Sequence, residues 1–164
     1  MKNKVAYFGL FTALALIFSY VEALIPFSIG IPGVKLGLAN LIVVIALYKM
    51  NIKEVYFLAV ARVVLAGFMF GNMFSILYSL AGGLLSVTVM YFLKKINGLS
   101  LIGVSIAGGV AHNIGQLIVA VFVVSSLNIA YYAPVLIIAG VITGMLIGIA
   151  ALEMLKRIKT FRFE

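Results

Sequence analysis

The chain has 164 residues, of which 65% are hydrophobic and only 10% are charged, and its net charge is +8. A soluble domain of this length is roughly half apolar and about a quarter charged, so this composition excludes a soluble globular protein. It predicts an all-α integral membrane protein with a single domain over residues 1–164. Because the chain contains no cysteine, disulfides and thiolate metal ligands are also excluded.

Six apolar segments follow one another along the chain. The predicted spans cover residues 5–24, 36–48, 55–70, 74–93, 101–124 and 135–155. Continuous apolar runs of this length predict helices, because a helix satisfies its own backbone N–H and C=O groups in lipid. The strands of a transmembrane β-barrel would instead alternate over about 10 residues.

The first two segments each have an unusual feature. The first resembles a signal peptide at its start, but its apolar run continues to Leu24, so we interpret it as a retained membrane helix. The second is short for a full crossing of about 20 residues. We therefore expect it to begin inside the preceding loop or to be shielded by its neighbours.

Most of the positive charge falls on one side of the six-span arrangement. The ten residues on that side are Lys2, Lys4, Lys49, Lys53, Lys94, Lys95, Lys156, Arg157, Lys159 and Arg162. The positive-inside rule then predicts a multi-pass plasma-membrane protein with both termini in the cytoplasm. The basic residues are interpreted as a rim beside anionic lipid; a nucleic-acid partner is not expected, because no clustered basic face with base-reading residues is present.

Three charged residues depart from this pattern. Arg62 lies midway along the third segment, Lys35 at the outer edge of the second and Glu22 near the outer end of the first. An unpaired charge in hydrocarbon costs at least ~2.5–3.5 kcal/mol, so such residues pair, face the interior or line water. Glu22 and Lys35 could form a salt bridge, or Lys35 could meet an incoming anionic group. Arg62 requires helix C-terminal carbonyls, amides of the fifth segment, a ligand or a docking partner.

The stretch GGVAHNIGQL places His112, Asn113 and Gln116 in the middle of the fifth apolar segment. Residues three and four apart share a helix face, so these side chains form one polar stripe at mid-depth. One interpretation is hydrogen bonding between helices, at about 0.6 kcal/mol per bond. The other is the wall of a ligand cavity open to the outer side, shared with Lys35 and Asn40. No metal site is expected, because cysteine and aspartate are absent and no acid neighbours His112 in the sequence.

Small residues mark faces on which helices can approach closely. They form one stripe on the last segment, where we expect packing within the chain, and one on the first, where we expect an external partner. The stripe on the last segment consists of Gly140, Gly144 and Gly148, and the stripe on the first segment consists of Ala6, Gly9 and Ala13.

The segments PGVKLGLAN, LAGGLLSVTVMYFLKK and GGVAHNIGQL resemble a small bacterial membrane family, the Gx transporter family, also named heptaprenyl diphosphate synthase component I. The resemblance covers about residues 5–155. The family is similar to the substrate-binding S components of energy-coupling-factor importers. That similarity implies six helices, ligand binding from outside beneath the first outer loop, and a docking motif at Ala6, Gly9 and Ala13 for a transmembrane coupling subunit. Separate ATPase subunits would supply energy.

The two family names imply different functions. Prenyl transfer needs aspartate-rich motifs that hold magnesium, but all four acidic residues are glutamates. We therefore predict no enzyme activity and no cofactor, but a vitamin- or cofactor-like ligand bound by an importer subunit. The alternative is a non-catalytic membrane partner of prenyl diphosphate or quinone metabolism, or of flavin-based electron transfer. The predicted ligand-binding residues are Lys35, Asn40, Arg62, His112, Asn113 and Gln116.

Overall fold

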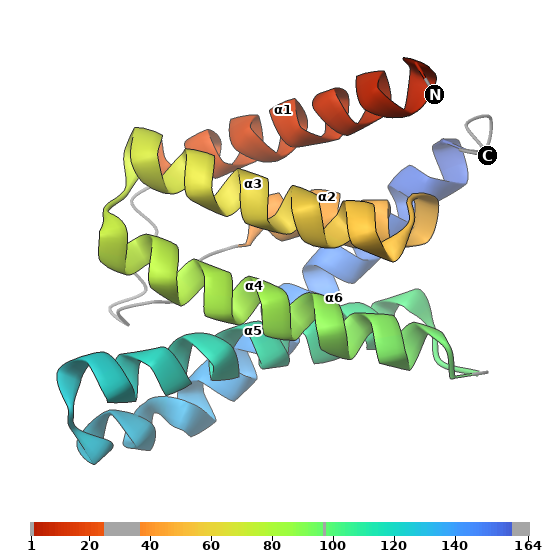
Figure 1. The fold of residues 1–164 in the computed structure, drawn as a ribbon. Coiled ribbons are helices and arrows are strands. Elements are labelled where there is room, and N and C mark those ends of the chain that lie inside the picture. Colours follow the sequence, from red (N-terminus) through yellow and green to blue (C-terminus); the bar gives the residue numbers. More distant parts are fainter. Residues whose placement is uncertain (1, 25–36, 97, 159–164) are drawn as a thin grey trace.

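The computed structural model describes residues 2–24, 37–96 and 98–158, and this part of the chain is helical without strands. The helices are α1 (Lys2–Leu24), α2 (Leu38–Lys49), α3 (Ile52–Phe70), α4 (Met73–Lys94), α5 (Leu101–Val124) and α6 (Ala133–Arg157). A short 3₁₀ helix, η1 (Leu127–Tyr132), precedes α6. Figure 1 shows α1 along one edge of the bundle and α5 along the opposite edge, with α6 crossing behind the bundle from the α5 edge toward the end at which both chain termini lie. The predicted six-helix fold class is confirmed.

The short helix α2 forms the centre of the bundle. It packs against α1, α3 and α6, and lies behind α3 in Figure 1. Its 12 residues span about 18 Å, which is less than the ~30 Å hydrocarbon core of a bilayer. The run from Leu41 to Leu47 is buried without interruption. A helix that is apolar all round is stable when its neighbours surround it, so the expectation that this segment is shielded is confirmed.

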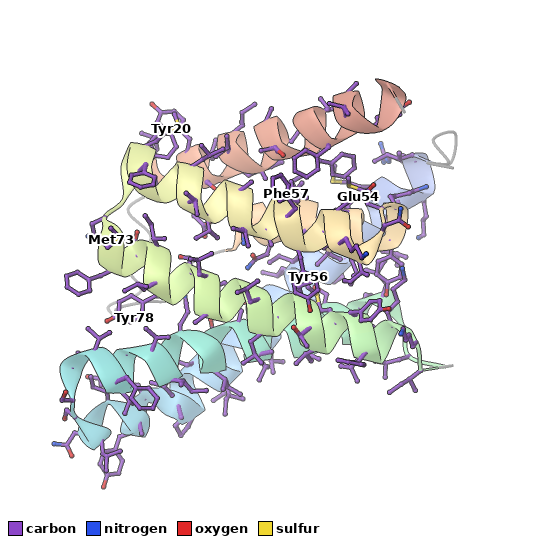
Figure 2. All side chains as sticks on the ribbon, in the orientation of Figure 1. Tyr20, Glu54, Tyr56, Phe57, Met73 and Tyr78 are labelled. Carbon is purple, nitrogen blue, oxygen red and sulfur yellow. The ribbon has the colours of Figure 1, made fainter. Side chains whose placement is uncertain are left out.

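Four helices of the described chain are long and apolar enough to cross a membrane. They cover Val5–Leu24, Met73–Lys94, Leu101–Val124 and Leu127–Arg157. Helix α3 has 19 residues but carries three charged side chains, those of Lys53, Glu54 and Arg62. Large apolar side chains face outward, including Phe57 and Met73, which are 65% and 64% exposed and are labelled in Figure 2. Such surfaces are typical of a protein that lies in lipid.

Glycines set the close packing of α5 against α6. A Cβ added to Gly109 would lie 2.4 Å from the carbonyl oxygen of Gly140, and one on Gly144 would lie 2.7 Å from the Cα of Ile106. A Cβ added to Gly148 would lie 2.9 Å from the Cα of Ile102. Side chains cannot occupy such gaps, so the two backbones meet only because these positions are glycine. The predicted internal packing of the α6 stripe is confirmed.

Lysines join helix ends on the side predicted to be cytoplasmic. The Nζ of Lys94 donates to the carbonyl oxygen of Leu47 at 2.7 Å, and the Nζ of Lys49 donates to that of Ile158 at 3.4 Å. The last carbonyls of a helix lack intrahelical partners and carry partial negative charge, which favours cations there. Two residues of the predicted basic rim therefore also tie α4 to α2 and α2 to α6.

Candidate functional site

A small, partly open cavity with several polar lining residues lies between α2, α4, α5 and α6. Its polar lining consists of Asn40, Ser86, Ser105, His112, Asn113, Gln116 and Thr143. Four of the predicted binding residues, Asn40, His112, Asn113 and Gln116, therefore come together, although Asn40 and His112 are far apart in the sequence.

The cavity lies at mid-depth of the bundle. His112 is at the midpoint of α5, which has 24 residues. Gly37 and Asn40 reach the same cavity from the first turn of α2, because α2 begins inside the bundle. Gly37 adopts φ +72°, a left-handed conformation that glycine accepts without strain, and turns the chain into the helix.

Arg62 lies behind Asn40, outside the cavity lining. Its side chain is 8% exposed, and its Nη2 donates to the Oδ1 of Asn40 at 2.5 Å. The sequence suggested helix carbonyls, α5 amides, a ligand or a docking partner for Arg62; the described residues add a partner that was not foreseen, and the ligand contact stays a prediction. The partner is an amide of α2, because α2 and α3 pack side by side at this level. Arg62 thus reaches the cavity only through Asn40.

Glu22 caps the entrance to α2. Its Oε1 accepts a hydrogen bond from the backbone N–H of Gly37 at 2.5 Å, and the carboxylate attracts Arg62 electrostatically. A negative charge at a helix N-terminus is stabilised by the helix dipole. Lys35 lies outside the described residues, so its predicted salt bridge with Glu22 and its predicted ligand contact stay predictions.

The polar stripe on α5 serves two purposes. The Nδ2 of Asn113 donates to the carbonyl oxygen of Leu136 on α6 at 2.7 Å, which is a bond between helices. Yet Asn113 also lines the cavity, together with His112 and Gln116. The interpretations drawn from the sequence, interhelical bonding and a polar cavity wall, thus describe the same stripe.

Three hydroxyl residues of the lining were missed by the sequence reasoning. Ser105 precedes His112 by seven residues and so shares its helix face, which is a signal that periodicity could have revealed. Ser86 and Thr143 carry no comparable signal, because single hydroxyl residues are common in membrane helices. The hydroxyls of Ser105 and Thr143 donate to the carbonyl oxygens of Gly144 and Ala139 at 2.7 and 2.8 Å.

The predicted docking stripe lies on the outward face of α1. Ala6, Gly9 and Ala13 are exposed, and a Cβ added to Gly9 would meet nothing within 4 Å. The opposite face packs on the bundle through Phe11 and Ala15, which are buried. The stripe is therefore separate from the contacts that hold α1 in place.

A comparison with known protein families identifies the family of this chain. The family model described as heptaprenyl diphosphate synthase component I matches residues 11–154. The chain belongs to this family. No curated protein and no solved structure matches it.

The match to the heptaprenyl diphosphate synthase component I family includes the whole cavity. All its lining residues, from Gly37 to Ile147, lie within the matched range. Ala6 and Gly9 of the docking stripe precede that range, whereas Ala13 falls inside it. The family resemblance seen in the sequence is thus confirmed, and the further similarity to energy-coupling-factor S components stays a prediction.

Proposed function

We propose that the chain is the membrane-embedded binding subunit of an importer and takes up a small, vitamin- or cofactor-like molecule. The observation that carries this proposal is the cavity at which Asn40, His112, Asn113 and Gln116 meet inside an otherwise apolar bundle. Buried polar groups are costly without partners. A network that served packing alone would need no open space between its members, whereas a ligand would occupy that space and satisfy the polar groups.

The distribution of charge supports loading from the outer side. Lys49, Lys94 and Lys95 lie at the end of the bundle where α2 and α4 finish, and this end is cytoplasmic under the positive-inside rule. The cavity instead adjoins the first turn of α2, which the chain enters after the first outer loop. In this proposal Lys35 offers its ammonium group to the incoming ligand, and Arg62 acts through Asn40.

Separate subunits would supply energy and coupling. The sequence holds no phosphate-binding loop of the form GxxxxGK[ST], so hydrolysis of ATP would occur elsewhere. Small residues allow two helix backbones to approach closely in lipid. The exposed stripe of Ala6, Gly9 and Ala13 supports docking of α1 on a transmembrane coupling subunit.

Extraction of bound molecules tests this proposal directly. The full chain would be purified in mild detergent and its small molecules identified by mass spectrometry, in parallel with Gln116→Ala and with Ser125→Ala as an exposed control. We expect one defined compound to be enriched with the wild type and the control, and depleted with Gln116→Ala. Recovery of the same compounds from all three proteins would contradict a ligand site in the cavity.

The family description carries a second candidate function. Its words name a component of heptaprenyl diphosphate synthase, which suggests a non-catalytic membrane partner of prenyl diphosphate or quinone metabolism. A flavin-based electron-transfer system is a related possibility. A role in prenyl diphosphate synthesis would require a separate catalytic subunit with the aspartates that this chain lacks. Affinity purification from native membranes distinguishes the candidates, because it would recover a prenyltransferase or redox protein in one case and ATPase subunits in the other.

A further inference from the structure

The two walls of the cavity present different sets of hydrogen-bond donors and acceptors. One wall belongs to α2 and carries Asn40; the other belongs to α5 and α6 and carries Ser105, His112, Asn113, Gln116 and Thr143. The hydrogen bonds that these side chains make to the protein decide which of their atoms are left for a ligand.

On the α2 wall, Arg62 sets the orientation of Asn40. A guanidinium has donors and no acceptor, so the Asn40 atom 2.5 Å from the Nη2 of Arg62 must be the carbonyl oxygen. The amide NH₂ group then points away from Arg62, and it lies over Gly37, where an added Cβ would come within 3.2 Å of the Nδ2. Since Arg62 is outside the lining and Asn40 is in it, the α2 wall offers N–H donors.

On the α5–α6 wall, the protein itself uses the hydroxyl protons. Ser105 and Thr143 each donate their single proton to a backbone carbonyl, so only their oxygen lone pairs remain for a ligand. Leu136 offers a carbonyl oxygen, which can only accept, so the Asn113 atom beside it must be the nitrogen. This bond turns the Oδ1 of Asn113 away from Leu136. Ser105, Asn113 and Thr143 therefore supply acceptors to the α5–α6 wall, and the side-chain amide of Gln116 adds both an acceptor and a donor.

We propose, building on the binding function proposed above, that the ligand is a neutral molecule with an amide-like edge, such as a lactam, a cyclic imide or a ureide. Its carbonyl oxygen accepts from the Nδ2 of Asn40, and its N–H group donates to the α5–α6 wall. Arg62 is the positioning residue that makes Asn40 a donor. An anion would bring negative charge against the acceptor oxygens of Ser105, Asn113 and Thr143, and a cation would meet the donors of Asn40 with Arg62 behind them.

The substitution Asn40→Asp tests the donor role without removing the side chain. Aspartate keeps the shape and can still accept from Arg62, but it places an oxygen where the amide NH₂ was. The probes are 2-pyridone, which has adjacent N–H and C=O groups, and N-methyl-2-pyridone, which lacks the donor. Their binding to the purified full chain would be measured by saturation-transfer NMR titration. Asn72→Asp is the matched control, since Asn72 caps α4 at an exposed position.

We expect the wild type and Asn72→Asp to bind 2-pyridone about tenfold more tightly than N-methyl-2-pyridone, because the methylated probe leaves buried acceptors unpaired. Asn40→Asp should lose about tenfold in 2-pyridone affinity while its thermal midpoint does not fall. Arg62→Met should also lose affinity, and Arg62→Lys should recover part of it by donating to the same oxygen. A purely structural role for Arg62 would lower the thermal midpoint and leave probe affinity unchanged.

Two results would overturn the proposal, and they have different consequences for the function. If the wild type binds both probes equally, or if Asn40→Asp binds 2-pyridone like the wild type, the assignment of donors and acceptors to the two walls is wrong while the binding function stands. If neither probe binds the wild type and the extraction experiment also yields no compound, the cavity is no ligand site, and the binding function fails as well.

Discussion

The Nη2 of Arg62 on α3 donates a hydrogen bond to the Oδ1 of Asn40 on α2, at 2.5 Å in the interior of the bundle. Among the residues that the structure describes, the buried Nε of Arg62 has no hydrogen-bond partner. Asn40 thus supplies a hydrogen-bond acceptor to the buried guanidinium, which Glu22 also attracts electrostatically, and Asn40 faces the cavity as well. One contact therefore links a buried charge to the candidate site.

This contact predicts that substituting Asn40 alone destabilises the protein more than substituting Asn40 and Arg62 together. Asn40→Ala should lower the free energy of unfolding by about 2–3 kcal/mol, because it leaves a buried charge without its acceptor. Adding Arg62→Met should recover much of that loss, since no charge then remains to be satisfied. Thermal unfolding in detergent would measure both effects, and simple additivity of the two substitutions would contradict this prediction.

Two α5 variants should separate ligand contact from helix packing. Gln116→Ala removes a cavity side chain and should weaken ligand binding several-fold with little change in stability. Asn113→Ala also removes the hydrogen bond between α5 and α6 at the carbonyl oxygen of Leu136, so it should lower stability by about 0.5–1.5 kcal/mol in addition. Binding of the co-purified compound and thermal unfolding would be measured side by side. Normal binding by both variants would place the ligand elsewhere.

The glycine contacts predict which glycines tolerate a methyl group. Gly109→Ala would place a Cβ 2.4 Å from the carbonyl oxygen of Gly140 and should lower the thermal midpoint clearly, because α5 and α6 must separate. Gly83→Ala meets nothing within 4 Å and lies in a helix, so it should be neutral or stabilising by up to about 1 kcal/mol. Equal midpoints for the two variants would show that α5 and α6 do not pack as described.

The two faces of α1 allow a matched test of docking. Ala13→Leu adds bulk to the exposed stripe and should abolish uptake in cells while the purified protein still binds its ligand. Ala15→Leu is the control, because Ala15 is fully buried and extra bulk there should destabilise the bundle itself, by about 1–3 kcal/mol. Loss of uptake and binding together in Ala13→Leu would indicate an effect on the fold and not on docking.

The orientation in the membrane can be tested with reporter fusions. Fusions at Asn51, Gly98 and the C-terminus should report a cytoplasmic location, and a fusion at Asn128 should report an external one, because the lysines and arginines gather on one side. A cytoplasmic signal from Asn128 would rule out the six-crossing arrangement.

The sequence by itself determined the helices of this protein. The fifth predicted span, residues 101–124, coincides with α5, and the other predicted bounds lie within a few residues of those observed. This agreement has a physical cause, since a long apolar run in lipid can satisfy its backbone only as a helix. Helical periodicity also placed His112 and Gln116 on one face and indicated close packing along the glycines of α6.

The tertiary structure alone decided which helix faces meet. Periodicity shows which residues of one helix share a face, but it carries no information about the helix that lies opposite. Asn40 therefore could not be assigned to Arg62 from the sequence, nor could Ser86 and Thr143 be assigned to the cavity. These neighbours follow from the burial of α2 at the centre and from the glycine contacts that bring α5 against α6, both of which depend on how all the helices pack together.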